Sequence, residues 1–208
     1  NANTKVDYTL TGHGGAIAFD VGAKDGYVIN SVFNDNHAHR DGGAIHYAAG
    51  ATRGIVINLT FINHTINYDG GAIYLNGTYC EIHNSTFLNN SAKDDGGAIF
   101  WQGDHGIIYN ITCDLNHGIG TGAGGGSSTK GGVHCLIGSD VSVDKSNFTN
   151  SYGGLLGGSI FVTGNNVNIT NSVFKNSTIG ISDGGALYVL GDNTLIRNCT
   201  FDNSTSPN

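Results

Sequence analysis

The sequence predicts an all-β fold: a right-handed, single-stranded parallel β-helix of about seven coils that forms one domain over residues 1–208. Two short phrases alternate along the chain, and each occurs seven times. Successive copies of the second phrase are mostly 26–28 residues apart. A unit of this length without helical periodicity is too short for a propeller blade and fits one coil of a β-helix.

The first phrase consists of two glycines, a small residue and an aliphatic residue. It is GGAI at positions 14, 42, 70 and 96, and it takes looser forms at 131, 157 and 184. Paired glycines mark places where the backbone needs a positive φ or approaches another backbone closely. We therefore expect each copy to form a corner of the coil, followed by a strand.

The second phrase contains an aromatic position that is preceded, five residues earlier, by Val or Ile in every copy. Its aromatic position is held in turn by Phe33, Phe61, Phe87, Cys113, Phe148, Phe174 and Phe201. We expect both columns to stack at the strand spacing of ~4.8 Å and to fill the interior.

A third column lies three residues before the aromatic position, where the chain must bend. It consists of Asn30, Asn58, Asn84, Asn110, Lys145, Asn171 and Asn198. Asn tolerates left-handed backbone conformations, and stacked amides can hydrogen-bond from coil to coil. We expect an internal asparagine ladder here.

One unit is longer than the others. A Gly-rich stretch at about 117–130 lengthens it to 35 residues, and we expect an inserted loop at a corner. Neither end carries an amphipathic helix that would cover the outermost strands. Either the coils belong to a longer protein, or their ends stack on partners.

The composition excludes some classes of protein. Charged residues make up 12% of the chain and the net charge is −7, so no basic surface is available for nucleic acid. No apolar run approaches the roughly 18 residues of a membrane span, so we expect no membrane insertion by this segment. The four cysteines lie on different coils, which allows at most one disulfide.

The alternation of GGA(I/L/V) with FxxN resembles the repeat of the polymorphic outer-membrane proteins, the autotransporter adhesins of chlamydiae. It is also similar to adhesin-like surface proteins of methanogenic archaea. The intact half-motifs are GGAI at Gly14, Gly42, Gly70 and Gly96, and FxxN at Phe33–Asn36 and Phe87–Asn90. The resemblance covers residues 14 to 204, with GGVH at 131, GGSI at 157 and Cys113 as departures. It implies a pectate-lyase-like β-helix used in adhesion, and it supplies no catalytic residues.

Enzymes also occur on the pectate-lyase-like fold, so catalysis is an alternative function. His13 between two glycines and the pair Asp94–Asp95 resemble pieces of the polygalacturonase pattern, in reversed order. His13 also simply occupies the position before the first repeat glycines. We expect no enzyme; a carbohydrate-active enzyme or its inactive relative would require paired carboxylates ~5–9.5 Å apart.

A column of aspartates directly precedes the glycine pairs. Asp41, Asp69 and Asp95 lie on consecutive coils, and Asp183 lies further along. Stacked carboxylates raise one another's pKa or bind a cation, and calcium is the candidate ion. The alternative is that each carboxylate accepts hydrogen bonds from the backbone N–H groups of its own glycine corner.

The strand after each glycine pair has two uniformly apolar columns, which we place inside. The residues between them would then point outward as a ladder of rings. This candidate binding face consists of His46, Tyr74, Phe100, Phe161 and Tyr188. Exposed rings suit sugars or another protein. The alternatives are that the insertion at 117–130 covers this face, or that inside and outside are exchanged.

Several Asn-x-Ser/Thr sequons arise from the repeat itself. Those in the expected internal ladder would be inaccessible to glycosylation. The candidate glycosylation sites are therefore Asn63, Asn76, Asn89, Asn176 and Asn203.

Together these features predict a non-catalytic extracellular module at the cell surface, used in adhesion or cell-envelope architecture. Its expected partners are a surface glycan, a protein receptor or its own coil ends. If the coil ends associate, the protein would be a head-to-tail filament subunit. No cofactor is expected apart from the candidate calcium.

Overall fold

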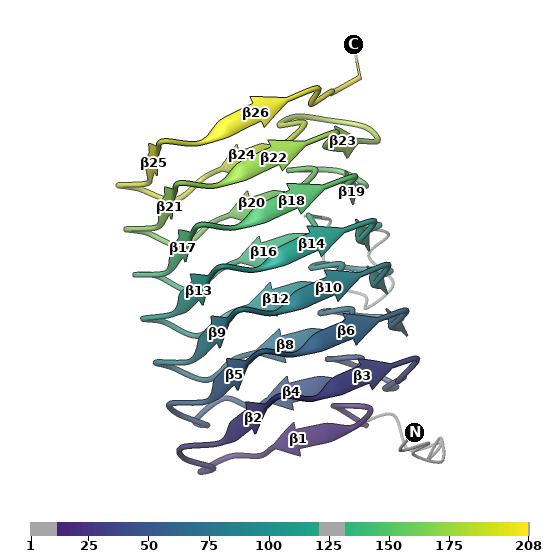
Figure 1. Cartoon of the computed structure of the whole chain (residues 1–208), viewed down its shortest axis with the longest axis vertical. Coiled ribbons are helices and arrows are strands. Elements are labelled where there is room, and N and C mark those ends of the chain that lie inside the picture. Colours follow the sequence, from purple (N-terminus) through teal and green to yellow (C-terminus); the bar gives the residue numbers. More distant parts are fainter. Residues whose placement is uncertain (1–11, 121–131, 208) are drawn as a thin grey trace.

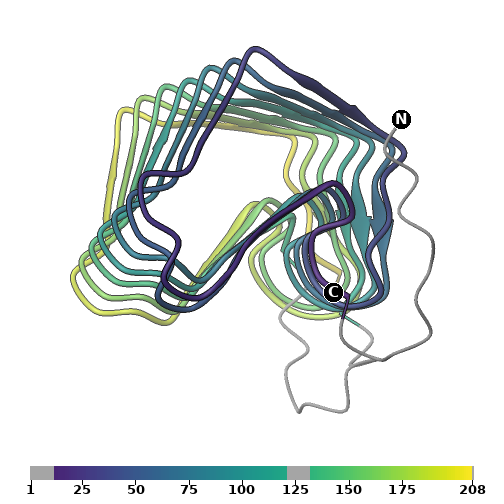
Figure 2. The same cartoon turned by 90° about the horizontal axis from the view of Figure 1, so that it is seen from below.

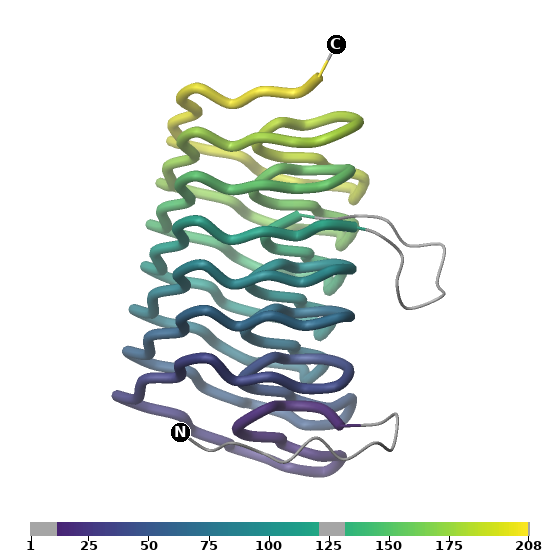
Figure 3. The backbone as a smooth tube through the Cα atoms, turned by 90° about the vertical axis from the view of Figure 1, so that its right-hand side faces the viewer, coloured from purple at the N-terminus to yellow at the C-terminus, as the bar shows by residue number. Residues whose placement is uncertain are grey.

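The computed structural model describes residues 12–120 and 132–207. These residues form short strands that wind into a parallel β-helix, and they contain no helix (Figure 1). The coils stack along one axis (Figure 3). Three sheets hold seven strands each, which enclose about six full turns. The predicted fold class is confirmed.

The strands form four parallel sheets along the axis. Sheet I consists of β1 (Ile17–Phe19), β4 (Ile45–Tyr47), β8 (Ile73–Leu75), β12 (Ile99–Trp101), β16 (His134–Leu136), β20 (Ile160–Val162) and β24 (Leu187–Val189). Sheet II consists of β2 (Tyr27–Ile29), β5 (Ile55–Ile57), β9 (Glu81–His83), β13 (Ile107–Tyr109), β17 (Ser142–Asp144), β21 (Asn168–Thr170) and β25 (Leu195–Arg197). Sheet III consists of β3 (Val32–Asn34), β6 (Thr60–Ile62), β10 (Thr86–Leu88), β14 (Thr112–Asp114), β18 (Asn147–Thr149), β22 (Val173–Lys175) and β26 (Thr200–Asp202). Sheet IV consists of β7 (Thr65–Ile66), β11 (Ser91–Ala92), β15 (His117–Gly118), β19 (Tyr152–Gly153) and β23 (Thr178–Ile179).

The glycine pair forms the corner between sheets IV and I, and its two glycines have different roles. Gly42 and Gly70 adopt φ values of 71° and 72°, which side chains disfavour. A Cβ on Gly43 or Gly71 would instead collide with the carbonyl oxygen of the corresponding glycine on the next coil. The first glycine therefore supplies the positive φ, and the second allows the close approach of the next coil.

The aromatic column fills the interior as predicted. The rings of Phe61 and Phe87 stack with their centroids 4.8 Å apart, and those of Phe148 and Phe174 lie 4.9 Å apart. Strand pairing keeps these residues directly opposite one another from coil to coil. Apart from the coil of Cys113, each ring therefore contacts the ring on the neighbouring coil.

Cys113 interrupts this stack, and a histidine fills the space that it leaves. His134 occupies the column that is Ile99 on the preceding coil and Ile160 on the next. Its Nε2 lies 3.4 Å from Cys113 Sγ, and its ring meets Phe148 edge-on at 5.0 Å between centroids. The shorter side chain of Cys113 in one column is thus matched by the longer side chain of His134 in the other, which reaches across to it.

The expected internal asparagine ladder is wrong in its placement. Asn58 donates to Asn30 and Asn110 donates to Asn84, each at 2.7 Å, so amides do bond from coil to coil. However, these residues are exposed. Their positive φ turns the chain around an outer bend between sheets II and III, and the residue that follows, such as Leu59, enters the core instead.

The internal polar ladder lies six residues further on, at the last position of FxxN. It consists of Asn36, His64, Asn90, Asn116, Ser151 and Ser177, all of which are buried. Asn90 Oδ1 accepts the backbone N–H of His64 at 3.1 Å, and Asn90 Nδ2 donates to the carbonyl oxygen of Phe61 at 3.2 Å. The amide of Asn90 thus gives the backbone N–H of the buried His64 a hydrogen-bond partner.

The predicted insertion is described only in part. Residues 117–120 belong to the coil, with His117–Gly118 as β15, whereas residues 121–130 lie outside the described residues. β12 and β16 still pair in register, with Phe100 opposite Cys135. All four cysteines lie within the described residues, and no disulfide joins any two of them.

Candidate functional site

The candidate binding face lies on the outer side of sheet I, as predicted. The inward residues of β12, Ile99 and Trp101, belong to the main core, whereas Phe100 belongs to a second, smaller apolar cluster. That cluster contains Phe100, Cys135 and Phe161, with Tyr74, Ile137, Leu156 and Tyr188 packed against it. The assignment of inside and outside is therefore correct for this sheet.

The expected exposure of these rings is wrong. Phe161 is fully buried, Phe100 is 5% exposed and His46 is 8% exposed, whereas Tyr74 and Tyr188 remain partly exposed. Viewed along the axis, the backbone of each coil bends inward on the side of sheet I (Figure 2). The neighbouring segments of the coil therefore flank the outer face of sheet I. The outer face of a flat sheet would instead be open to solvent. Tyr74 and Tyr188 are the rings that solvent reaches.

The column of aspartates is divided between two groups of side chains. Asp69 lies with Asp94 and Asp95, and their carboxylate oxygens are within 4.8 Å of one another. Burial raises the pKa of Asp69 to about 7, and the negative charge of Asp95 adds to this increase. The predicted grouping of Asp41 with Asp69 and Asp95 as three calcium ligands is thus not the one that the structure forms.

The alternative, a hydrogen bond from the carboxylate to its own glycine corner, is not what the structure shows for Asp69. Asp69 Oδ1 accepts the backbone N–H of Asp95 on the next coil at 3.0 Å. The N–H of Gly70 donates to the main-chain oxygen of Asp95, also at 3.0 Å. The carboxylates thus link successive coils, because the glycine amides already bind the backbone of the neighbouring coil.

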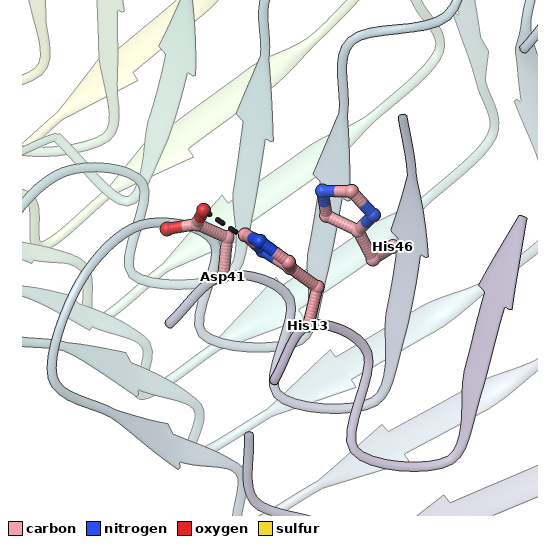
Figure 4. A group of neighbouring side chains, drawn as sticks. All are labelled: His13, Asp41 and His46. Carbon is pink, nitrogen blue, oxygen red and sulfur yellow. Dashed lines mark ion pairs between the residues drawn. The ribbon is translucent and has the colours of Figure 1, made fainter. Parts of the chain in front are cut away.

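Asp41 lies instead with two histidines at the start of the same face (Figure 4). His13 Nδ1 is 3.1 Å from Asp41 Oδ2, and the rings of His13 and His46 are 4.5 Å apart between centroids. Burial lowers the pKa of His46 to about 4, so its imidazole is neutral at physiological pH. Burial raises the pKa of Asp41, although His13 and Arg40 act in the opposite direction.

The sequence contains a signal for this group of side chains. His13 occupies in the first coil the column that is Asp41 in the second, directly before the glycines. His46 occupies the outward column of sheet I one coil above Ala18. Adjacent columns therefore bring the three side chains together, and their ligand atoms lie within 4.8 Å of one another.

The candidate glycosylation sites are accessible to different degrees. Asn63, Asn89 and Asn203 are exposed, whereas Asn76 and Asn176 are partly exposed. Several of them donate along a second external ladder, as Asn89 Nδ2 does to Asn63 Oδ1 at 2.8 Å. Because Asn58 and its counterparts are also exposed, burial does not exclude their sequons, contrary to our expectation.

Comparison with known protein families gives one match. Residues 30–48 and 84–100 match the Chlamydia polymorphic membrane protein repeat. The predicted resemblance to the chlamydial repeat is confirmed for these two segments. Each matched segment runs from an asparagine bend through sheet III and the glycine corner into sheet I. The match indicates a module of a surface or outer-membrane protein.

No curated protein matches the chain. Within the described residues, no helix has the length and apolar character needed to cross a membrane.

Proposed function

We propose that this chain is a non-catalytic extracellular module of a cell-surface protein, which serves in adhesion or in the architecture of the cell envelope. The match of two segments to the chlamydial membrane-protein repeat carries this proposal. The fold is consistent with it, because coils whose backbones bond directly to their neighbours form an elongated scaffold that presents long lateral surfaces.

The geometry of the carboxylates favours a non-catalytic role over a carbohydrate-active enzyme. A glycosidase holds two carboxyl groups ~5–9.5 Å apart on either side of the scissile bond, whereas Asp69, Asp94 and Asp95 gather in one cluster with oxygen atoms within 4.8 Å of one another. Asp94 and Asp95 are also buried, which leaves no room for a sugar between them.

Localisation can be tested with antibodies raised against the purified chain. Intact cells of the source organism should bind the antibodies as strongly as permeabilised cells do. Labelling only after permeabilisation would contradict a surface position.

Adhesion requires a separate test, because a purely architectural module would pass the first one. Beads coated with the purified chain should be retained on a glycan array or on a cell monolayer. We expect the partly exposed rings of Tyr74 and Tyr188 to contribute, so Tyr74→Ala and Tyr188→Ala should reduce retention. Retention no higher than that of uncoated beads would leave envelope architecture as the function.

A second candidate, association through a coil end, rests on exposed core columns. Ile196 and Phe201 are 44% and 48% exposed, whereas their counterparts Ile169 and Phe174 on the preceding coil are fully buried. An apolar surface of this kind accepts a further coil, whether that coil belongs to the same chain or to a second copy. Light scattering with electron microscopy tests this: filaments support stacking, and stable monomers contradict it.

A further inference from the structure

We propose that His13, Asp41 and His46 form a binding site for one divalent transition-metal ion of the Zn²⁺ class. The three side chains come from two successive coils and converge on the outer side of sheet I (Figure 4). Such a site is independent of the proposed surface function.

The donor set is the first reason. Two imidazole nitrogens and one carboxylate oxygen form a common set for Zn²⁺ and related ions, whereas Ca²⁺ prefers oxygen ligands alone. Ligands at 2.0–2.1 Å from a tetrahedral zinc ion lie about 3.3 Å apart. The separation of 3.1 Å between His13 Nδ1 and Asp41 Oδ2 is close to this value.

The position of the site is the second reason. The side chain of His13 is 31% exposed and that of Asp41 is 12% exposed, so the group lies near the surface, although His13 Nδ1 itself is buried. His46 stacks on Tyr74 with ring centroids 5.0 Å apart, which holds its imidazole in place. Holding a ligand in position before the metal arrives strengthens binding.

The same columns one coil further on lack this chemistry, and no other group of two histidines and an aspartate occurs in the part of the chain that the structure describes. The positions of His13, Asp41 and His46 are taken there by Asp41, Asp69 and Tyr74. On the coil after that, Phe100 replaces Tyr74. The two imidazoles therefore distinguish the first coil from those that follow.

A bound ion would link the coil of β1 to the coil of β4. His13 precedes β1, while Asp41 and His46 lie immediately before and within β4. We infer that the metal fastens the first coil to the rest of the β-helix and raises the thermal midpoint of the holo-protein.

The test is titration of the tag-free chain with Co²⁺, followed by visible absorption, and with Zn²⁺ in equilibrium dialysis. We expect one ion per chain and no displacement by equimolar Ca²⁺. His46→Tyr uses the residue that the next coil already carries at this position, so it should fold. His46→Tyr and His13→Gln should each weaken Zn²⁺ binding by roughly tenfold or more.

A matched control is His83→Gln. His83 also faces a carboxylate, Glu81, at 2.7 Å, but no second imidazole joins them in a ligand group within the described residues. This variant should bind Zn²⁺ as the wild type does. Circular dichroism of each variant verifies the fold. The proposal is overturned if the wild type binds less than one ion, if neither site variant weakens binding, or if Ca²⁺ competes equally.

Discussion

Acid should destabilise this protein through the buried His134, and replacing the Cys113–His134 pair should remove that contribution. Burial lowers the pKa of His134 to about 3, whereas an unfolded chain holds histidine near pKa 6.5. Between these values the unfolded chain binds a proton that the folded protein excludes. The contribution of His134 to the free energy of unfolding is therefore fully present above about pH 6.5, and it declines as the pH falls toward 3.

The size of the effect follows from the two pKa values. Between about pH 7.5 and about pH 5, His134 alone should lower the free energy of unfolding by about 2 kcal/mol. His64, whose pKa burial lowers to about 4, and other groups also titrate in this range. The measurement must therefore compare two proteins that differ only at the pair.

The comparison protein is the double variant Cys113→Phe/His134→Ile. It places in this coil the residue types that the flanking coils carry: a phenylalanine between Phe87 and Phe148, and an isoleucine between Ile99 and Ile160. Urea denaturation, followed by the fluorescence of Trp101, gives the free energy of unfolding at each pH. The variant should lose about 2 kcal/mol less than the wild type on acidification. Equal losses would refute the reasoning.

The single variants test whether the two residues compensate each other. Cys113→Phe alone should collide with the His134 ring, and His134→Ile alone should leave a cavity beside Cys113. The double variant should therefore be more stable than the two single variants predict, with a coupling of roughly 1–3 kcal/mol. Additive effects would show that the contact between them carries no energy.

Three further predictions follow from the fold. Asn90→Ala should cost roughly 1–3 kcal/mol, because it leaves the buried backbone N–H of His64 without a partner. Asn89→Gly keeps the positive φ on the exposed ladder and should cost less than about 1 kcal/mol; equal midpoints in urea would contradict this. Gly71→Ala should lower the thermal midpoint more than Gly50→Ala, because only the first variant places a Cβ against the backbone of the next coil. A larger decrease for Gly50→Ala would contradict the role of Gly71 in the close approach of the coils. A thiol reagent should label one cysteine per native chain, the partly exposed Cys199, and all four after unfolding; rapid labelling of a second thiol in the native state would contradict the burial described.

The sequence identified the fold because a β-helix repeats each position at a fixed interval. Residues one unit apart stack directly on one another, so a column of Phe or Ile in the sequence becomes a column in the core. The departures were visible as well, since Cys113 stood out in its column. That His134 compensates for it required the structure, because the two residues belong to different sheets and meet only across the interior.

The placement of polar columns depended on the direction of each bend. Asn58 and Asn90 are both repeated asparagines near a corner, and their periodicity is the same. Whether a side chain points outward depends on the backbone angle at that residue: Asn58 has a φ of 55° and lies outside. Asn90 has no positive φ and lies inside. A repeated position in the sequence therefore predicts which residues stack on one another. It does not predict whether they stack in the interior or on the surface of the β-helix.

By itself, the sequence determined the period, the identity of the core columns and the corner role of the glycines, because each is a property of one position repeated along the axis. Only the tertiary structure decided the burial of the candidate binding face and the meeting of His13, Asp41 and His46. Both depend on how neighbouring columns lie around the circumference of the coil, and the inward bend beside sheet I sets that arrangement.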